Sequence, residues 1–134
     1  MKLCLITGGS RGLGKALVSK CAETGFTVYE FSRSGMSDHH VFCDFSAPLD
    51  SARILEKTFS DLSQKTYSDV LLINNAGTIQ PIGPIREFEA DQWIANLHVN
   101  LSSTIIASGF FLKYFQNSTA RKVIAVISSG SAAR

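Results

Sequence analysis

The stretch Thr7-Gly8-Gly9-Ser10-Arg11-Gly12-Leu13-Gly14 decides the fold, because its four glycines separate an apolar run from a helical pattern. The preceding run, Leu3–Thr7, predicts a short buried strand, and the following Lys15–Thr24 has apolar residues at helical spacing and is ended by Gly25. Glycines let the backbone approach a ligand closely, and a helix N-terminus offers free N–H groups and a positive dipole end. A strand, a glycine turn and a helix in this order predict a diphosphate site, and a tight turn without a ligand is the alternative.

The same stretch overlaps a second phosphate-binding motif. Gly9–Lys15 matches the glycines and the lysine of the phosphate-binding loop of ATPases. That loop needs a serine or threonine after the lysine to hold magnesium, and the residue here is Ala16. We therefore expect no conventional magnesium site, and an ATPase is the weaker interpretation.

The rest of the chain alternates short apolar runs with helical segments. We predict strands at Phe26–Ser32, Val41–Phe45, Val70–Ile73 and Val123–Ile127, and helices at Pro48–Ser63 and Asp91–Phe115, the latter bent near Asn100. This alternation indicates βαβ units with a parallel sheet and right-handed crossovers. In such a sheet the ligand lies beyond the carboxyl ends of the strands, so the residues after each strand are the informative ones.

Two arginines lie where an adenosine ribose would bind. An NAD-preferring site usually has an acidic residue at the end of the second strand, but Glu30 lies inside that strand and the sequence does not fix its direction. Arg33 follows the strand and Arg11 lies in the glycine turn. Two guanidinium groups could hold a 2′-phosphate in forked hydrogen bonds, so we expect NADP(H) as the cofactor, with solvation of a surface arginine as the alternative.

Polar residues also follow the other strands. Asp44, after the third, could accept a hydrogen bond from an adenine amino group or could serve as a turn or cap residue before Pro48. Asn74-Asn75-Ala76-Gly77, after the fourth, combines small residues with amides that can tie loops together. Ser128-Ser129-Gly130-Ser131, after the fifth, offers a hydroxyl to a substrate carbonyl, and a plain serine–glycine loop is the alternative.

Taken together, these elements resemble the short-chain dehydrogenase/reductase family. The glycine stretch is similar to its cofactor motif, Asp44 to its adenine-contacting position and Asn74–Gly77 to its Asn-Asn-Ala-Gly element. Asn100 matches the family's catalytic asparagine, and Ile127-Ser128-Ser129 matches the strand that carries its catalytic serine. Within the family, LINNAGT at 72–78 and NLHVNL at 96–101 are most similar to sepiapterin reductase and the bacterial benzil reductases.

The resemblance implies an α/β, Rossmann-type doubly wound parallel sheet of about five strands in the order 3-2-1-4-5. It implies a carbonyl or dicarbonyl reductase in which Ser129 polarises the substrate carbonyl and Asn100 holds a helix bend and a water of the proton relay. The residues expected to bind the cofactor are Thr7, Gly8, Ser10, Arg11, Gly12, Leu13, Gly14, Arg33, Asp44, Phe45, Asn75, Ala76 and Gly77.

One family element is missing from these 134 residues. The family needs a Tyr-x-x-x-Lys pair after the serine, and none of Tyr29, Tyr67 and Tyr114 has a lysine four residues later. We therefore interpret residues 1–134 as one dinucleotide-binding domain, truncated after the fifth strand and inactive alone. The alternative is a non-catalytic NADP-binding module or redox sensor.

The amino-acid composition limits the kinds of partner that we expect. Thirteen basic and 11 acidic residues give a net charge of +2, which offers no electrostatic argument for nucleic acid. No stretch is long and apolar enough for a membrane span. Three cysteines with no zinc spacing indicate reduced thiols, and we expect a cytoplasmic protein with a small carbonyl substrate, homo-oligomeric in its complete form.

Overall fold

The computed structural model describes residues 1–129, so Gly130 and Ser131 of the predicted serine loop lie outside the described residues. Five parallel strands form one sheet in the order β3-β2-β1-β4-β5, which confirms the predicted class and strand order. The strands are β1 (Lys2–Thr7), β2 (Phe26–Ser32), β3 (His40–Phe42), β4 (Asp69–Asn74) and β5 (Arg121–Val126). The helices are α1 (Gly12–Glu23), α2 (Pro48–Leu62), α3 (Ala90–Leu97) and α4 (Ser103–Phe115), with a 3-10 turn η1 (Ile85–Glu87) and a π turn η2 (His98–Ser102).

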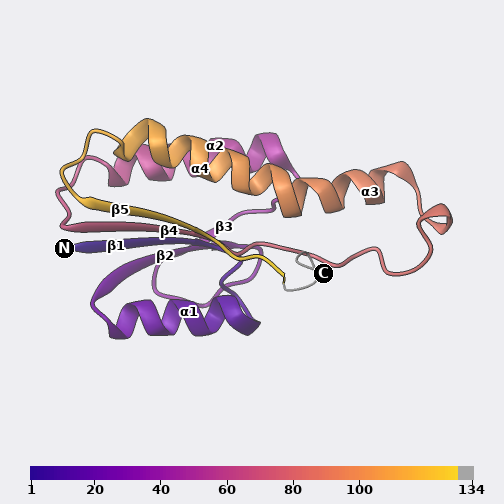
Figure 1. Ribbon diagram of the computed structural model, residues 1–134, viewed down its shortest axis with the longest axis horizontal. Helices are drawn as coiled ribbons and strands as arrows, with labels where there is room; N and C mark the ends of the chain where they lie inside the picture. The colour runs from indigo at the N-terminus through magenta and orange to yellow at the C-terminus, as the bar shows by residue number, and fades with distance from the viewer. Residues whose placement is uncertain (130–134) are drawn as a thin grey trace.

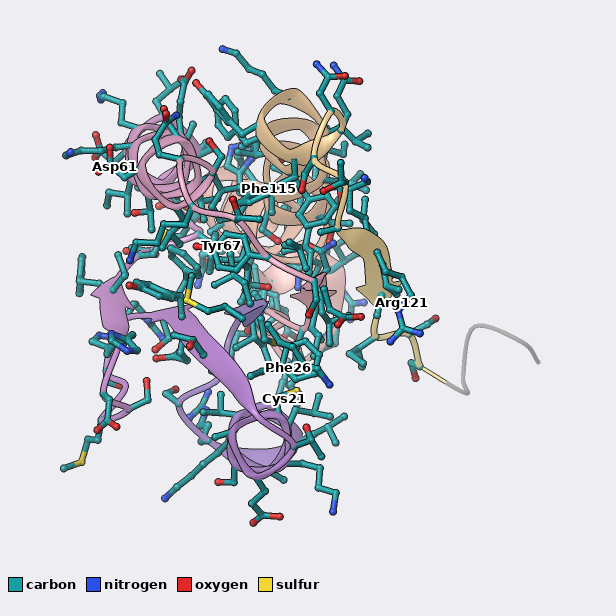
Figure 2. The ribbon with its side chains drawn as sticks, turned by 90° about the vertical axis from the view of Figure 1, so that its left-hand side faces the viewer. Cys21, Phe26, Asp61, Tyr67, Phe115 and Arg121 are labelled. Carbon is teal, nitrogen blue, oxygen red and sulfur yellow. The ribbon has the colours of Figure 1, made fainter. Side chains whose placement is uncertain are left out.

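Helices cover both faces of the sheet (Figure 1), with α2 and α4 on one side and α1 on the other. Alternate residues of each strand point to opposite faces, so Leu3 and Leu5 enter the larger cluster beneath α2 and α4 while Cys4 and Ile6 face α1. Figure 2 shows Phe115 on the α4 side of the sheet and Cys21 on α1. The buried side chains of the larger cluster include Phe31, Leu55, Phe59, Leu72, Phe111 and Phe115.

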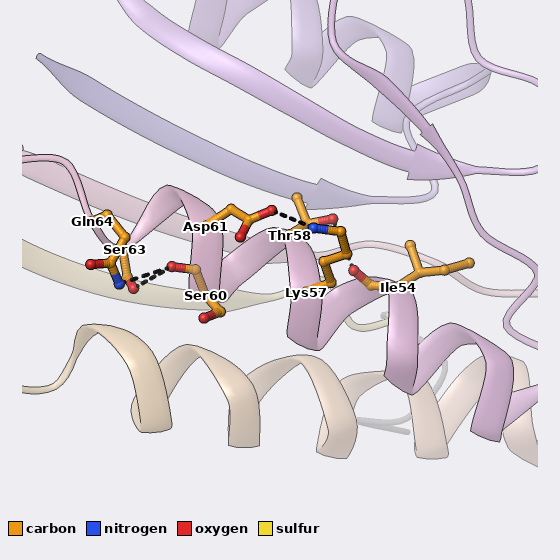
Figure 3. A network of polar contacts seen from close by, with 7 residues as sticks. All are labelled: Ile54, Lys57, Thr58, Ser60, Asp61, Ser63 and Gln64. Atoms are coloured by element: carbon orange, nitrogen blue, oxygen red, sulfur yellow. Dashed lines mark hydrogen bonds and ion pairs between the residues drawn. The ribbon is translucent and has the colours of Figure 1, made fainter.

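Helix α2 shows how these helices are held. It begins with Pro48, whose fixed φ suits a first helical residue. On its surface Lys57 pairs with Asp61 at 2.9 Å, and at its end the Ser63 hydroxyl donates to the Ser60 carbonyl (Figure 3). Exposed ion pairs contribute less than about 1 kcal/mol each, so burial of the apolar face stabilises this helix more. That buried face consists of Ser51, Leu55, Phe59 and Leu62.

The structure corrects three predicted boundaries. Strand β3 spans His40–Phe42 rather than 41–45, because the Asp44 carboxylate accepts the Ser46 N–H and turns the chain away from the sheet. Helix α1 begins at Gly12, inside the predicted glycine turn. The predicted single helix from 91 to 115 is divided into α3, η2 and α4, and the π turn η2 contains Asn100, where a bend was expected.

Strand β5 forms an edge of the described sheet, with its side chains partly open to solvent. Val123 is 49% and Val126 is 56% exposed, although β5 pairs along its whole length with β4. An apolar parallel strand is normally covered on both faces, and among residues 1–129 strand β5 pairs on one side only, with β4. Among residues 1–129, no helix is long and apolar enough to cross a membrane.

Candidate functional site

The glycine turn joins the carboxyl end of β1 to the N-terminus of α1, as predicted. Gly8 and Gly12 have φ values of +73° and +57°, which side chains rarely adopt, so glycine is required for the shape of the turn. Among residues 1–129, no side chain caps α1, and its first turn carries no acidic residue. Its first N–H groups and its positive dipole end are therefore available to an anion.

Thr7 and Asn75 fix this turn to the segment after β4. The Thr7 hydroxyl, almost fully buried, accepts the N–H groups of Asn75 at 3.1 Å and Ala76 at 3.0 Å. The Asn75 amide in turn donates to the Gly8 carbonyl at 2.9 Å. A Cβ added at Gly14 would overlap that carbonyl and that amide, so helix, turn and segment are packed in direct contact.

A cavity of about 720 Å³ opens between the glycine turn and the segments that follow β2, β3 and β4. The structure brings together there all but one of the residues predicted to bind the cofactor, namely Gly8, Ser10, Arg11, Gly12, Leu13, Gly14, Arg33, Asp44, Phe45, Asn75, Ala76 and Gly77. The exception is Thr7, which does not line the cavity. Its hydroxyl instead accepts the backbone N–H groups of Asn75 and Ala76. The cavity continues past Pro81 to Asn96 and Val99 of the α3 region.

Arg33 and Asp44 lie together at one end of the cavity. The Asp44 carboxylate accepts hydrogen bonds from the Ser46 hydroxyl and N–H, and these bonds, with the nearby Arg33 charge, lower the pKa of Asp44 below its ordinary value. Asp44 therefore serves as the turn residue foreseen as an alternative while still facing the cavity, and its contact with adenine stays a prediction. Ser32, also lining the cavity, has a buried hydroxyl oxygen without a hydrogen-bond partner among the described residues.

Glu30 does not line this cavity. Its side chain is fully buried on the α1 side of the sheet, where Oε1 accepts the Gly9 N–H at 3.0 Å and Oε2 lies 2.6 Å from Nδ1 of His40. Both carboxylate oxygens are thus engaged inside the protein. The acidic residue that could have indicated an NAD-type ribose contact is therefore not available to a ligand in this cavity.

Asn100 holds the backbone that leads out of the site. Its side-chain oxygen accepts the Thr78 N–H at 2.8 Å and its amide donates to the Thr78 carbonyl at 2.9 Å. The Asn96 amide, one helical turn earlier, donates to the Gln80 carbonyl at 2.8 Å. Helix α3 and the π turn are therefore fixed to the extended segment that borders the cavity.

Ser128 and Ser129 follow the end of β5. The Ile127 N–H still donates to the Asn74 carbonyl at 3.0 Å, so the serines leave the sheet at the edge where the glycine turn and the Asn75 segment also lie. Both serines are exposed. Neither lines the cavity, and the catalytic role of Ser129 stays a prediction.

Comparison with known proteins places this arrangement in a family. The family described as short chain dehydrogenase matches residues 2–134. The chain belongs to the short-chain dehydrogenase family. This short-chain dehydrogenase is 34% identical over 143 residues to a benzil reductase ((S)-benzoin forming) of Bacillus cereus, and 30% identical over 139 residues to one of Bacillus subtilis.

Both alignments include 98% of this chain but only 57% and 56% of the relatives, so the chain spans about half their length. The resemblance to bacterial benzil reductases noted in the sequence is thereby confirmed. A crystal structure of a short-chain dehydrogenase/reductase from Burkholderia vietnamiensis agrees in fold, with a TM-score of 0.85 and 24% identity over 98% of this chain and 65% of that one.

Several residues in and beside the cavity of this short-chain dehydrogenase were not selected from its sequence as site residues, among them Ser32, Asn96, Glu30 and His40. Ser32 and Asn96 lack any spacing that would distinguish them from ordinary strand and helix residues. Glu30 and His40 are ten residues apart, and only the parallel pairing of β2 with β3, which sets Glu30 opposite His40, brings them together. The one available signal was an acidic residue inside an otherwise apolar strand, because a buried carboxylate needs a partner.

Proposed function

We propose that this domain is the NADP(H)-binding part of a carbonyl reductase that acts on small carbonyl or dicarbonyl compounds. The observation that carries the proposal is the uncapped N-terminus of α1, which faces a cavity bordered by two exposed arginines, Arg11 and Arg33. The similar benzil reductases support a dicarbonyl as substrate.

The residues fit a dinucleotide along the cavity. The free N–H groups of the first turn of α1 would hold the pyrophosphate. Arg33 and Arg11 would pair with a ribose 2′-phosphate, with the unpartnered Ser32 hydroxyl nearby to donate a hydrogen bond. Asp44 would accept from the adenine amino group with the carboxylate oxygen that Ser46 leaves free.

The bound nicotinamide would supply the hydride, and the protein's residues would orient and polarise the substrate. The Ser129 hydroxyl would donate a hydrogen bond to the substrate carbonyl oxygen, and Asn100, through Thr78, would keep the wall of the cavity in place. A serine hydroxyl is too weak an acid to protonate the developing alkoxide near neutral pH. We propose that a Tyr-x-x-x-Lys pair in a longer form of the protein does so, and that residues 1–134 alone do not turn over.

Cofactor preference tests the first half of the proposal. Purified protein titrated with NADPH and NADH, followed by nucleotide fluorescence, should bind NADPH at least tenfold more tightly, since one charge-assisted bond contributes about 1.5–3 kcal/mol. Arg33→Ala should abolish that preference. Arg53→Ala, an exposed arginine on α2 paired with Asp50, is the matched control and should leave it unchanged. Equal affinities in the unsubstituted protein would contradict the two-arginine argument.

Turnover and gene sequence test the second half. A longer form of the protein should oxidise NADPH when a 1,2-diketone is added, whereas residues 1–134 should not. A coding sequence that continues past codon 134 into Tyr-x-x-x-Lys supports the reductase. A stop codon there, with NADPH binding intact, favours the non-catalytic module. Cytoplasmic location and self-association of the complete protein stay predictions.

A further inference from the structure

A buried carboxylate links two loops of the cofactor cavity without lining it. Glu30 is 0% exposed, its Oε1 accepts the Gly9 N–H at 3.0 Å, and its Oε2 lies 2.6 Å from Nδ1 of His40. An ionised carboxylate can only accept hydrogen bonds, so with Glu30 in that form Nδ1 of His40 is the donor of that contact. One side chain on β2 thus holds the glycine turn on one side and β3 on the other.

The loop between β2 and β3 packs on the same pair. A Cβ added at Gly35 would overlap both Glu30 Oε2 and His40 Nδ1, so the backbone of this loop lies directly on the two polar groups. The backbone N–H of His40 also donates to the Ser37 carbonyl at 3.2 Å. Since this loop begins with Arg33, the pair supports the backbone that carries the proposed 2′-phosphate contact.

Stability alone gives no reason for this arrangement. Removing a carboxylate from water is costly, and replacing a buried polar pair by apolar side chains of similar volume is often neutral or stabilising. The strand neighbour on the same face, Val28, is apolar and buried like the rest of the α1 cluster. Retention of Glu30 is better explained by what it fixes, namely the Gly9 amide and the loop after Arg33.

We propose that Glu30 and His40 are positioning residues that set the dinucleotide affinity and the NADPH preference of this domain. Glu30 fixes the glycine turn that seats the pyrophosphate, and through His40 and Gly35 it fixes the loop that presents Arg33. The inference rests on the proposed cofactor site, and neither residue is among those that line the cavity.

Two pairs of substitutions separate the two links. Glu30→Met keeps the volume but removes both acceptors, and it should raise the Kd for NADH about tenfold and that for NADPH more. Glu30→Gln keeps an acceptor for Gly9, and its NH2 group can donate to Nδ1 of His40 when the ring proton is on Nε2, so both Kd values should stay within about threefold of the unsubstituted protein. His40→Ala leaves the hydrogen bond from Gly9 to Glu30 in place. It should therefore raise the Kd for NADPH about tenfold and change the Kd for NADH little. His40→Asn retains a polar group near the Nδ1 position and should restore the preference.

The affinities should be measured by fluorescence titration, with the stoichiometry giving the folded fraction and thermal melts confirming folding. A purely structural role would lower the stoichiometry without changing the ratio of the two Kd values. Unchanged Kd values in folded Glu30→Met, or no rescue by Gln and Asn, overturn the positioning role while leaving the cofactor site intact. If the unsubstituted protein binds neither dinucleotide, the proposed function fails and the positioning role fails with it.

Discussion

Replacing Gly14 by alanine tests whether the turn, the helix and the Asn75 segment form one packed unit. Gly14 lies in the first turn of α1 and is buried, and its φ is not positive. Backbone strain therefore does not oppose alanine there. On helix propensity alone the substitution would stabilise the protein by at most about 1 kcal/mol.

The contacts of the new Cβ outweigh this gain, so we expect Gly14→Ala to destabilise the protein. The new Cβ would overlap the Gly8 carbonyl oxygen, a backbone atom held in place by its bond from the Asn75 amide. Overpacking a tight site costs about 1–3 kcal/mol, and losing the Asn75–Gly8 bond adds about 0.5–1.5 kcal/mol. After the propensity gain, we expect a destabilisation of roughly 2 kcal/mol, which lowers Tm by roughly 5–10 °C in a chain of this size.

The matched control is Gly109→Ala on α4. Gly109 is an exposed helix residue whose added Cβ would meet no atom within 4 Å, so propensity acts there without opposition. Gly109→Ala should raise Tm by about 2–5 °C. Thermal unfolding followed by circular dichroism gives the Tm of the unsubstituted protein, Gly14→Ala and Gly109→Ala. Titration of Gly14→Ala with NADPH should also show weaker binding. If Gly14→Ala proves as stabilising as Gly109→Ala, the close packing inferred here is wrong.

Further substitutions test other parts of the structure. Thr7→Val removes the acceptor of two part-buried N–H groups, and the loss of two hydrogen bonds should lower the free energy of unfolding in urea by about 1–3 kcal/mol, whereas Thr7→Ser should lower it little. Hydrogen bonds from Lys113 and Tyr114 lower the pKa of the Glu56 carboxyl in the folded protein. The ionised Glu56 therefore stabilises the fold above the pKa of the unfolded carboxyl, and this stabilisation is lost as the pH falls through the pKa of the folded carboxyl. Glu56→Gln should be less stable than the unsubstituted protein at pH 7 and equally stable in strong acid. Burial raises the pKa of the Cys43 thiol to about 12, so Cys43 should resist a thiolate-selective alkylating reagent until the chain unfolds, as mass spectrometry of peptides would show.

The sequence predicted the sheet well because its signals were local. The apolar runs and the glycine turn predicted the parallel βαβ arrangement, and the family resemblance implied the strand order; all but one of the residues predicted to bind the cofactor line the cavity. The errors lie where side chains override local preference. Val41–Phe45 consists mainly of residues that favour strands, but the turn formed by Asp44 and Ser46 ends β3 at Phe42. The division of the helix at η2 accompanies the bonds from Asn100 to Thr78, a contact 22 residues away that no helical periodicity encodes.

Glu30 shows the limit most clearly, because its chemistry depends on the face of β2 to which it points. In an apolar strand, an acid three residues before Arg33 is compatible with either an NAD-type ribose contact or an internal pair. The period of two places Glu30 with Val28 on the α1 face, and there the Gly9 amide and the His40 ring engage both its oxygens. Within the described part of the chain, the cavity is lined by Arg33 and Arg11 and by one carboxylate, Asp44. We expect a cleft with that balance to favour the dinucleotide that carries the additional phosphate, and under the proposed positioning role this preference depends on the fixed loop after Arg33.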